Sequence, residues 1–244
     1  MSIQFDPNAI EKEIKAERKA SKSKSTMFAI RIGIIIAMVA VLFGTYLILD
    51  SRDGQVTIGS DDYETTVDTT RLLVNISNPN NPVVVLIMED GAEIAIELFP
   101  EYAPITVANF IQLVEGRFYD GLTFHRIIDN FMMQGGCPVG NGTGNSDHRI
   151  TGEFINNGTT NPLQHMRGAV SMARMGTDFN SATSQFFIVQ RDSHILNNDY
   201  AVFGFVIYGM DSVDSIINAS EPLDSNGTIL FADQPVIRIA AVIN

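Results

Sequence analysis

The chain has 244 residues but only one cysteine, Cys137. A single thiol cannot form a disulfide within the chain, which excludes a small scaffold held together by disulfides. It also excludes a zinc site made of several cysteines. The four histidines show no spacing typical of metal ligands. We therefore expect no metal site in this protein.

Lysine does not occur after Lys24, and basic residues are scarce beyond that point. The first 31 residues carry seven Lys or Arg against four Asp or Glu, whereas residues 32–244 carry nine against twenty-four. The main part of the chain therefore has a formal net charge of −15. Such an acidic chain would repel a phosphate backbone, so we expect no nucleic-acid partner.

Charged residues are also absent from the apolar run at residues 32–49, IGIIIAMVAVLFGTYLIL. As a helix this run would be about 27 Å long, close to the hydrocarbon thickness of a bilayer. It is apolar on every side, which favours a membrane span over a buried core helix. Six basic residues lie before it at residues 12–24, a seventh, Arg31, directly adjoins it, and Asp50 and Asp53 follow it. The positive-inside rule then predicts a cytoplasmic N-terminus and an exported main part.

These features divide the chain into four expected parts. They are a basic cytoplasmic stub at residues 1–26, a transmembrane signal anchor at 27–49, a polar linker at 50–81 and one domain at 82–244. We expect the anchor to stay uncleaved, because the run is longer than that of a usual signal peptide and no small-residue cleavage site follows. Asn and Pro residues break regular structure in the linker, where residues 71–76 form a candidate short strand.

Within residues 82–244, apolar and polar residues mostly alternate, as in strands with one buried face. Residues 103–115 and 210–217 have helical spacing instead. Strands are expected at 83–88, 93–98, 123–128, 168–172, 185–189, 202–206 and 235–243. Many short strands with two helices predict a mainly β domain, either a closed antiparallel barrel or a sandwich.

Arg126 stands out because it lies in an apolar strand, FHRII, with no acidic residue beside it in sequence. A buried charge without a partner is costly. The sequence leaves two alternatives: Arg126 forms an ion pair with a distant carboxylate, or it faces a functional cleft. Periodicity alone favours the ion pair.

Five segments, FHRII, FMMQGG, GAVSMA, SQFFI and AVFG, follow one another in this order. Together with ELFPEYAPITVANFIQL and VIYGMDSVDSI, they closely resemble the cyclophilin family of peptidyl-prolyl cis-trans isomerases over residues 83–244. The resemblance implies a closed eight-stranded antiparallel barrel capped by two helices. It also implies rotation of X-Pro amide bonds, against a barrier of about 18–20 kcal/mol. Because this reaction makes and hydrolyses no bond, we expect no cofactor.

The resemblance also implies roles for individual residues. Arg126 would be the catalytic guanidinium, and Gln134 would orient it or bind the substrate carbonyl. The main chain at Arg174 would hold the residue before proline. The other residues expected to bind the substrate are His125, Phe131, Met132, Ala173, Phe187, Leu196 and Tyr200.

The chain departs from the family pattern at three places. Arg174 and Met175 stand where members often have Asn-Ala, which predicts a narrower and more positive neighbouring pocket. Ile195 takes a position that is tryptophan in cyclosporin-sensitive members, so we expect weak or no cyclosporin binding. Tyr200 replaces a histidine found in many members, but it can still pack against the proline ring.

Two hypotheses about function remain. The first is a single-pass cell-membrane isomerase with an extracytoplasmic domain, whose partners are proline-containing unfolded or exported polypeptides and whose reaction assists their folding. The second is a non-catalytic binding module or holdase that grips proline-containing segments on the same fold. The presence of Phe131, Met132, Gln134 and Phe187 alongside Arg126 favours the enzyme, and a turnover assay would distinguish the two.

Overall fold

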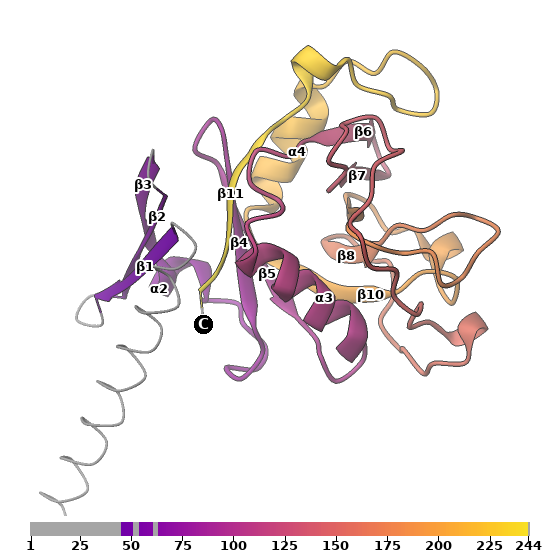
Figure 1. Cartoon of the computed structure of the whole chain (residues 1–244), viewed down its shortest axis with the longest axis horizontal. Helices are drawn as coiled ribbons and strands as arrows, with labels where there is room; N and C mark the ends of the chain where they lie inside the picture. The colour runs from indigo at the N-terminus through magenta and orange to yellow at the C-terminus, as the bar shows by residue number, and fades with distance from the viewer. Residues whose placement is uncertain (1–44, 51–53, 61–62, 244) are drawn as a thin grey trace, which may run out of the picture. The chain divides into compact units, whose positions relative to one another are not determined.

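The computed structural model describes residues 45–50, 54–60 and 63–243 (Figure 1). The chain divides into two compact units, Met1–Asp68 and Thr69–Asn244. The expected cytoplasmic stub and residues 27–44 of the expected anchor lie outside the described residues. Among the helices of the described ranges, none is long and apolar enough to cross a membrane.

In the first unit, the described residues form a three-stranded antiparallel sheet of β1 (Thr45–Asp50), β2 (Gln55–Ser60) and β3 (Tyr63–Asp68). Residues 45–49 are therefore a strand, where we expected the end of the anchor helix, because they pair with β2 along a six-residue ladder. Both β2 and β3 lie within residues 50–81, which we expected to be a polar linker. Val56 and Val67 are buried partners across these two strands, a pairing that the many Thr and Asp residues obscured.

The second unit begins with the short helix α2 (Thr69–Leu72) in place of the candidate strand at 71–76. Local hydrogen bonds from Leu73 and Ile76 close turns that a strand could not form. The following turns are tied to the sheet by the buried carboxylate of Glu97. Glu97 accepts hydrogen bonds from the main chain of two turn residues and from two side chains. This part of the expected linker therefore belongs to the folded domain.

Eight strands form one antiparallel sheet in the second unit, which confirms the expected mainly β architecture. The strand order is β11-β4-β5-β10-β8-β9-β7-β6. The strands are β4 (Val83–Met88), β5 (Glu93–Leu98), β6 (Phe124–Ile128), β7 (Met132–Gly135), β8 (Ala169–Met172), β9 (Phe186–Val189), β10 (Val202–Tyr208) and β11 (Ile237–Val242).

The sheet is curled, but it is not the closed barrel that the resemblance implied. Its end strands β6 and β11 form no ladder with each other, and the seam is spanned by one bridge, between Thr123 and Val236. Neighbouring main-chain bonds, such as that from Phe124 N to Pro235 O at 3.0 Å, support this bridge. The pairing ends there because β6 is irregular after Phe124, and Arg126 bridges Thr228 instead. The result is an open half-barrel.

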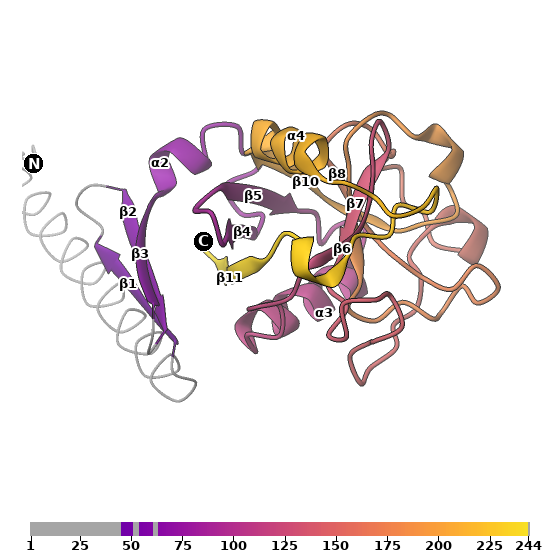
Figure 2. The same ribbon diagram turned by 90° about the horizontal axis from the view of Figure 1, so that it is seen from above.

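Two longer helices, α3 (Pro104–Glu115) and α4 (Met210–Ala219), cover opposite sides of the curled sheet (Figure 2). Pro104 occupies the first turn of α3, where its missing N–H costs nothing. The carboxylate of Glu153 accepts the next main-chain N–H groups at 3.0 and 2.8 Å. Short 3₁₀ turns lie at η1 (Ile155–Asn157), η2 (His194–Leu196) and η3 (Phe231–Asp233).

The main core lies between the sheet and these helices. Phe110 of α3 is at its centre, with ring centroids at 5.0–5.3 Å from those of Tyr119, Phe186 and Phe203. The helical spacing predicted that Phe110 faces inward, and the structure confirms it. Aromatic packing of this density makes the core a rigid support for the strands.

Candidate active site

A second, smaller apolar cluster lies apart from the main core, on strands β7, β8, β9 and β10. We call it the site cluster. Its buried members are Met132, Ala169, Phe187, Val189 and Val202. Its partly exposed members include Ile128, Phe131, Leu163, Ala173, Leu196 and Tyr200. Six residues predicted to bind substrate therefore meet here: Phe131, Met132, Ala173, Phe187, Leu196 and Tyr200.

Arg126 lies beside the site cluster on β6, directly opposite Gln134 on β7. Its Nη1 donates to Gln134 Oε1 at 3.2 Å and lies 3.8 Å from Met132 Sδ. Its Nε donates to the main-chain oxygen of Asn226 at 2.8 Å. Within the described part of the chain, Arg126 forms no ion pair with a carboxylate. The ion-pair interpretation that periodicity favoured is therefore wrong.

The guanidinium of Arg126 is half-buried, and its surroundings have opposing effects on its pKa. Burial lowers the pKa of Arg126, while the fields of Tyr200 and Asp224 act against this effect. An arginine begins so far above neutral pH that it stays protonated. A charged donor that has lost part of its hydration forms stronger hydrogen bonds with the acceptors it contacts. Asp224 itself is bonded to Thr228 and so leaves Arg126 unpaired.

A chain of side-chain amides fixes the position of Gln134. Gln134 Nε2 donates to Gln185 Oε1 at 3.0 Å, and Gln185 Nε2 donates to the carbonyls of Gly142 and Gly144 at 2.9 and 2.7 Å. With its nitrogen held by Gln185, Gln134 has to present its oxygen to Arg126. We assigned no role to Gln185 from the sequence. The signal was a polar residue opening an otherwise apolar strand segment, SQFFI.

His125, expected at the edge of the substrate site, is buried and directly precedes Arg126 on β6. Its Nδ1 has no hydrogen-bond partner among the described residues. A side chain added at Gly142 would come within 3.3 Å of His125 Nε2, so the ring packs against the loop of residues 140–144. Burial, helped by the charge of Arg126, lowers the pKa of His125 to about 4, and the ring is neutral at pH 7.

His165 is a second buried histidine, and the sequence gave no reason to place it near the site. Its ring lies nearly parallel to that of Phe187, with centroids 5.9 Å apart. Its Nδ1 lies 3.0 Å from Asn197 Oδ1, and its Nε2 lies 3.0 Å from Ser171 Oγ. An amide oxygen can only accept, so Nδ1 carries the proton and Nε2 accepts from the hydroxyl. Burial lowers the pKa of His165 to about 4, although the bond to Asn197 acts against this.

The rim of the site carries Arg174 and Tyr200. Tyr200 meets Phe187 edge to face, with centroids 5.9 Å apart, and the guanidinium carbon of Arg174 lies 4.5 Å from the centre of the Tyr200 ring. Ile195, the position compared with tryptophan, is 87% exposed. Weak cyclosporin binding stays a prediction.

Two further observations concern the surroundings of the site. No group of three or more His, Cys, Asp or Glu side chains in the described ranges could hold a metal ion. A groove of about 800 Å³ lies elsewhere, between α4, the turn after β4 and residues 233–235, and none of the predicted site residues lines it.

Known proteins share this arrangement of sequence and fold. Residues 83–237 match the family model described as cyclophilin type peptidyl-prolyl cis-trans isomerase/CLD. Peptidyl-prolyl cis-trans isomerase B of Bacillus subtilis strain 168 is 47% identical over 132 residues, which cover 54% of this chain and 88% of that protein. A peptidyl-prolyl cis-trans isomerase of Helicobacter pylori strain 26695 is 42% identical over 132 residues, covering 53% and 77%.

A solved structure agrees with these relatives. It is a Cryptosporidium parvum cyclophilin type isomerase, crystallised in the presence of the dipeptide Ala-Pro. It superposes with a TM-score of 0.59 at 28% sequence identity, over 66% of this chain and 99% of that one. The family model covers well over half of the chain and includes Arg126, Gln134 and the site cluster. This chain belongs to the cyclophilin-type peptidyl-prolyl cis-trans isomerase family.

Proposed function

We propose that this isomerase rotates X-Pro bonds by donating a hydrogen bond from Arg126 to the prolyl nitrogen. The observation that carries the proposal is the placement of a half-buried, unpaired guanidinium beside an apolar cluster. Nε and Nη1 of Arg126 are bonded to the protein, whereas Nη2 forms no hydrogen bond with the described residues. This nitrogen is available to the substrate.

The chemistry depends on a difference between ground state and transition state. Twisting the amide makes the prolyl nitrogen pyramidal and gives it a lone pair that accepts a hydrogen bond, which the planar amide lacks. A donor fixed at that point stabilises the twisted state selectively. A millionfold acceleration needs about 8 kcal/mol, while one charged hydrogen bond supplies about 1.5–3 kcal/mol. The site cluster would supply the rest by holding the ring and excluding water.

The apolar members of the site cluster support proline as the group that is bound. Met132 and Phe187 are almost fully buried and form its floor, while Phe131, Leu196 and Tyr200 are partly exposed around them. The related Cryptosporidium protein was crystallised with Ala-Pro, which fits the same substrate class. Proline-containing segments of unfolded polypeptides are therefore the proposed substrates.

A turnover assay on the full chain in detergent tests the proposal. The substrate is a peptide anilide with one Ala-Pro bond, and a protease that cleaves only the trans form reports the rate. We expect the trans form to appear much faster than in the uncatalysed exchange, which takes tens to hundreds of seconds. Binding of the peptide without any acceleration would contradict the proposal and support the non-catalytic module.

We also propose that the enzyme is tethered to the cell membrane and acts on exported polypeptides. Although residues 45–49 belong to β1, residues 27–44 would still span about 27 Å as a helix. The basic residues before them and the acidic chain after them support an exported domain. The protein should remain in membranes after a carbonate wash. Release by the wash, or loss of about 50 residues, would contradict an uncleaved anchor.

A further inference from the structure

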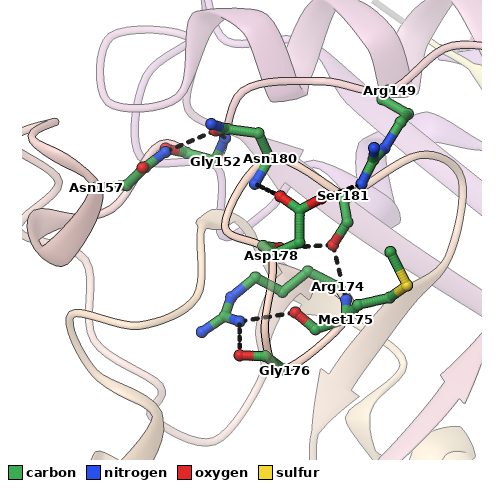
Figure 3. Close-up of polar contacts among 9 residues, drawn as sticks. All are labelled: Arg149, Gly152, Asn157, Arg174, Met175, Gly176, Asp178, Asn180 and Ser181. Atoms are coloured by element: carbon green, nitrogen blue, oxygen red, sulfur yellow. Dashed lines mark hydrogen bonds and ion pairs between the residues drawn. The ribbon is translucent and has the colours of Figure 1, made fainter.

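Arg174 opens the loop of residues 174–181 that follows β8, and carbonyl groups hold its side chain. Nη1 donates to the main-chain oxygens of Met175 and Gly176 at 3.0 and 3.1 Å (Figure 3). Nε donates to the main-chain oxygen of Asp199 at 2.8 Å. Among the described residues, no carboxylate forms an ion pair with Arg174. Three acceptors of this kind fix the plane of the guanidinium as a single charge contact could not.

Aromatic rings surround the same guanidinium. Its central carbon lies 4.5 Å from the ring centre of Tyr200, 4.7 Å from that of Phe179 and 5.3 Å from that of Phe154. Each distance is within the range of about 6 Å over which a cation is attracted to a ring face. Arg174 thereby joins three stretches of chain: its own loop, the stretch before β10 and the stretch before η1.

Bonds that do not involve the side chain of Arg174 also shape this loop. Ser181 Oγ accepts the main-chain N–H of Met175 at 2.8 Å and donates to the main-chain oxygen of Asp178 at 2.6 Å. The side chain of Asp178 accepts the main-chain N–H of Asn180 at 2.9 Å (Figure 3). These bonds lie within the loop, whereas the bond of Arg174 to Asp199 and its contact with the ring of Tyr200 attach the loop to the stretch before β10.

We propose that Arg174 is a positioning residue of the isomerase. Its side chain holds the main chain at residues 174–176 and the ring of Tyr200 in the conformation that receives the substrate. The inference rests on the proposed function, because Tyr200 belongs to the site cluster and meets Phe187. Lysine could not replace Arg174, since one ammonium group cannot reach three carbonyls in a plane while lying over three rings.

The test measures KM and kcat separately for the full chain and for two variants, Arg174→Ala and Arg174→Lys. We expect both variants to raise KM for the Ala-Pro peptide by about fivefold or more, with kcat within about twofold, because ground-state positioning is lost while Arg126 is intact. An unchanged KM in Arg174→Ala would overturn the proposal. Full rescue by lysine would also overturn it, since charge alone would then suffice.

Arg149→Ala provides a matched control, because Arg149 contacts the same loop through an ion pair with Asp178. We expect its KM to stay within about twofold of the wild type. An equal rise in both variants would mean general loosening of the loop and would overturn the role of Arg174. Calorimetric titration gives the Kd of the same peptide without turnover, and the same fivefold weakening is expected. A wild type that binds but does not turn over would contradict the proposed function, while Kd would still test Arg174.

Discussion

Two arginines flank the site cluster, and different groups surround them. Arg126 has one carbonyl, one amide oxygen and one sulfur around it, and one of its terminal nitrogens forms no bond to the described residues. Arg174 has three carbonyls and three rings. The same side chain thus serves two purposes. Nη2 of each arginine forms no hydrogen bond with the described residues, so the difference lies in what surrounds the guanidinium. A guanidinium beside an apolar cluster can act on a substrate, whereas one covered by aromatic rings fixes the shape of the chain around it.

Lowering the pH should protonate the buried histidines near the two arginines, whereas the arginines themselves keep their charge. Burial lowers the pKa of both His125 and His165 to about 4, below the ordinary value of 6.5. A base with a lowered pKa stabilises the fold fully above pH 6.5, and this stability is lost as the pH falls through about 4. The free energy of unfolding should therefore drop by up to about 3 kcal/mol for each histidine.

Urea titrations at several pH values between 7 and 4 measure this drop. The variant His165→Asn, which can still hydrogen-bond, should lose about half of the pH dependence. An equally steep drop in the variant would show that His165 does not contribute to the acid response. The arginines should contribute nothing in this range, because they stay charged throughout.

Removing the guanidinium of Arg126 should have the largest effect on catalysis. We expect Arg126→Ala to lower kcat/KM at least tenfold, because the twisted amide loses its hydrogen-bond donor. The fold should persist, since Arg126 is only half-buried and the main core does not include it. Circular dichroism serves as the control. Wild-type activity in a folded variant would show that the reaction does not use this guanidinium.

Part of the fold and part of the site could be predicted from the sequence. The residue pattern located seven of the eight strands of the main sheet and missed β7, and helical spacing placed Phe110 inward. The cluster around Phe187 followed only from resemblance to a family. The partners of Arg126 could not be predicted, because Asn226 is 100 residues away and meets it only through the curl of the sheet. The three rings around Arg174 could not be predicted either, because they come from three loops, and no local sequence pattern determines the conformation of these loops.

Removing Gln185, which holds Gln134 against Arg126, should lower kcat/KM less than removing Arg126 itself. Gln185→Ala frees the nitrogen of Gln134, so that Gln134 can rotate its oxygen away from the guanidinium. We expect kcat/KM to fall about threefold to fivefold, with most of the change in kcat, since a hydrogen bond that orients the donor is lost. Gln112→Ala on the exposed face of α3 is the matched control and should leave both constants unchanged. Equal values for Gln185→Ala and the control would remove Gln185 from the site.

The smallest effect should come from a third arginine, which has the carboxylate that the other two lack. Arg149 pairs with Asp178, but both side chains are more than a third exposed. Water and salt screen such a pair, so Arg149→Ala should change the free energy of unfolding by less than about 0.5 kcal/mol in urea titrations. Arg174→Ala, which removes no ion pair, should cost more than this, because carbonyl bonds and ring contacts fix a side chain better than an exposed charge pair does. The reverse order would mean that charge pairing, and not the cage of carbonyls and rings, determines how firmly this loop is held.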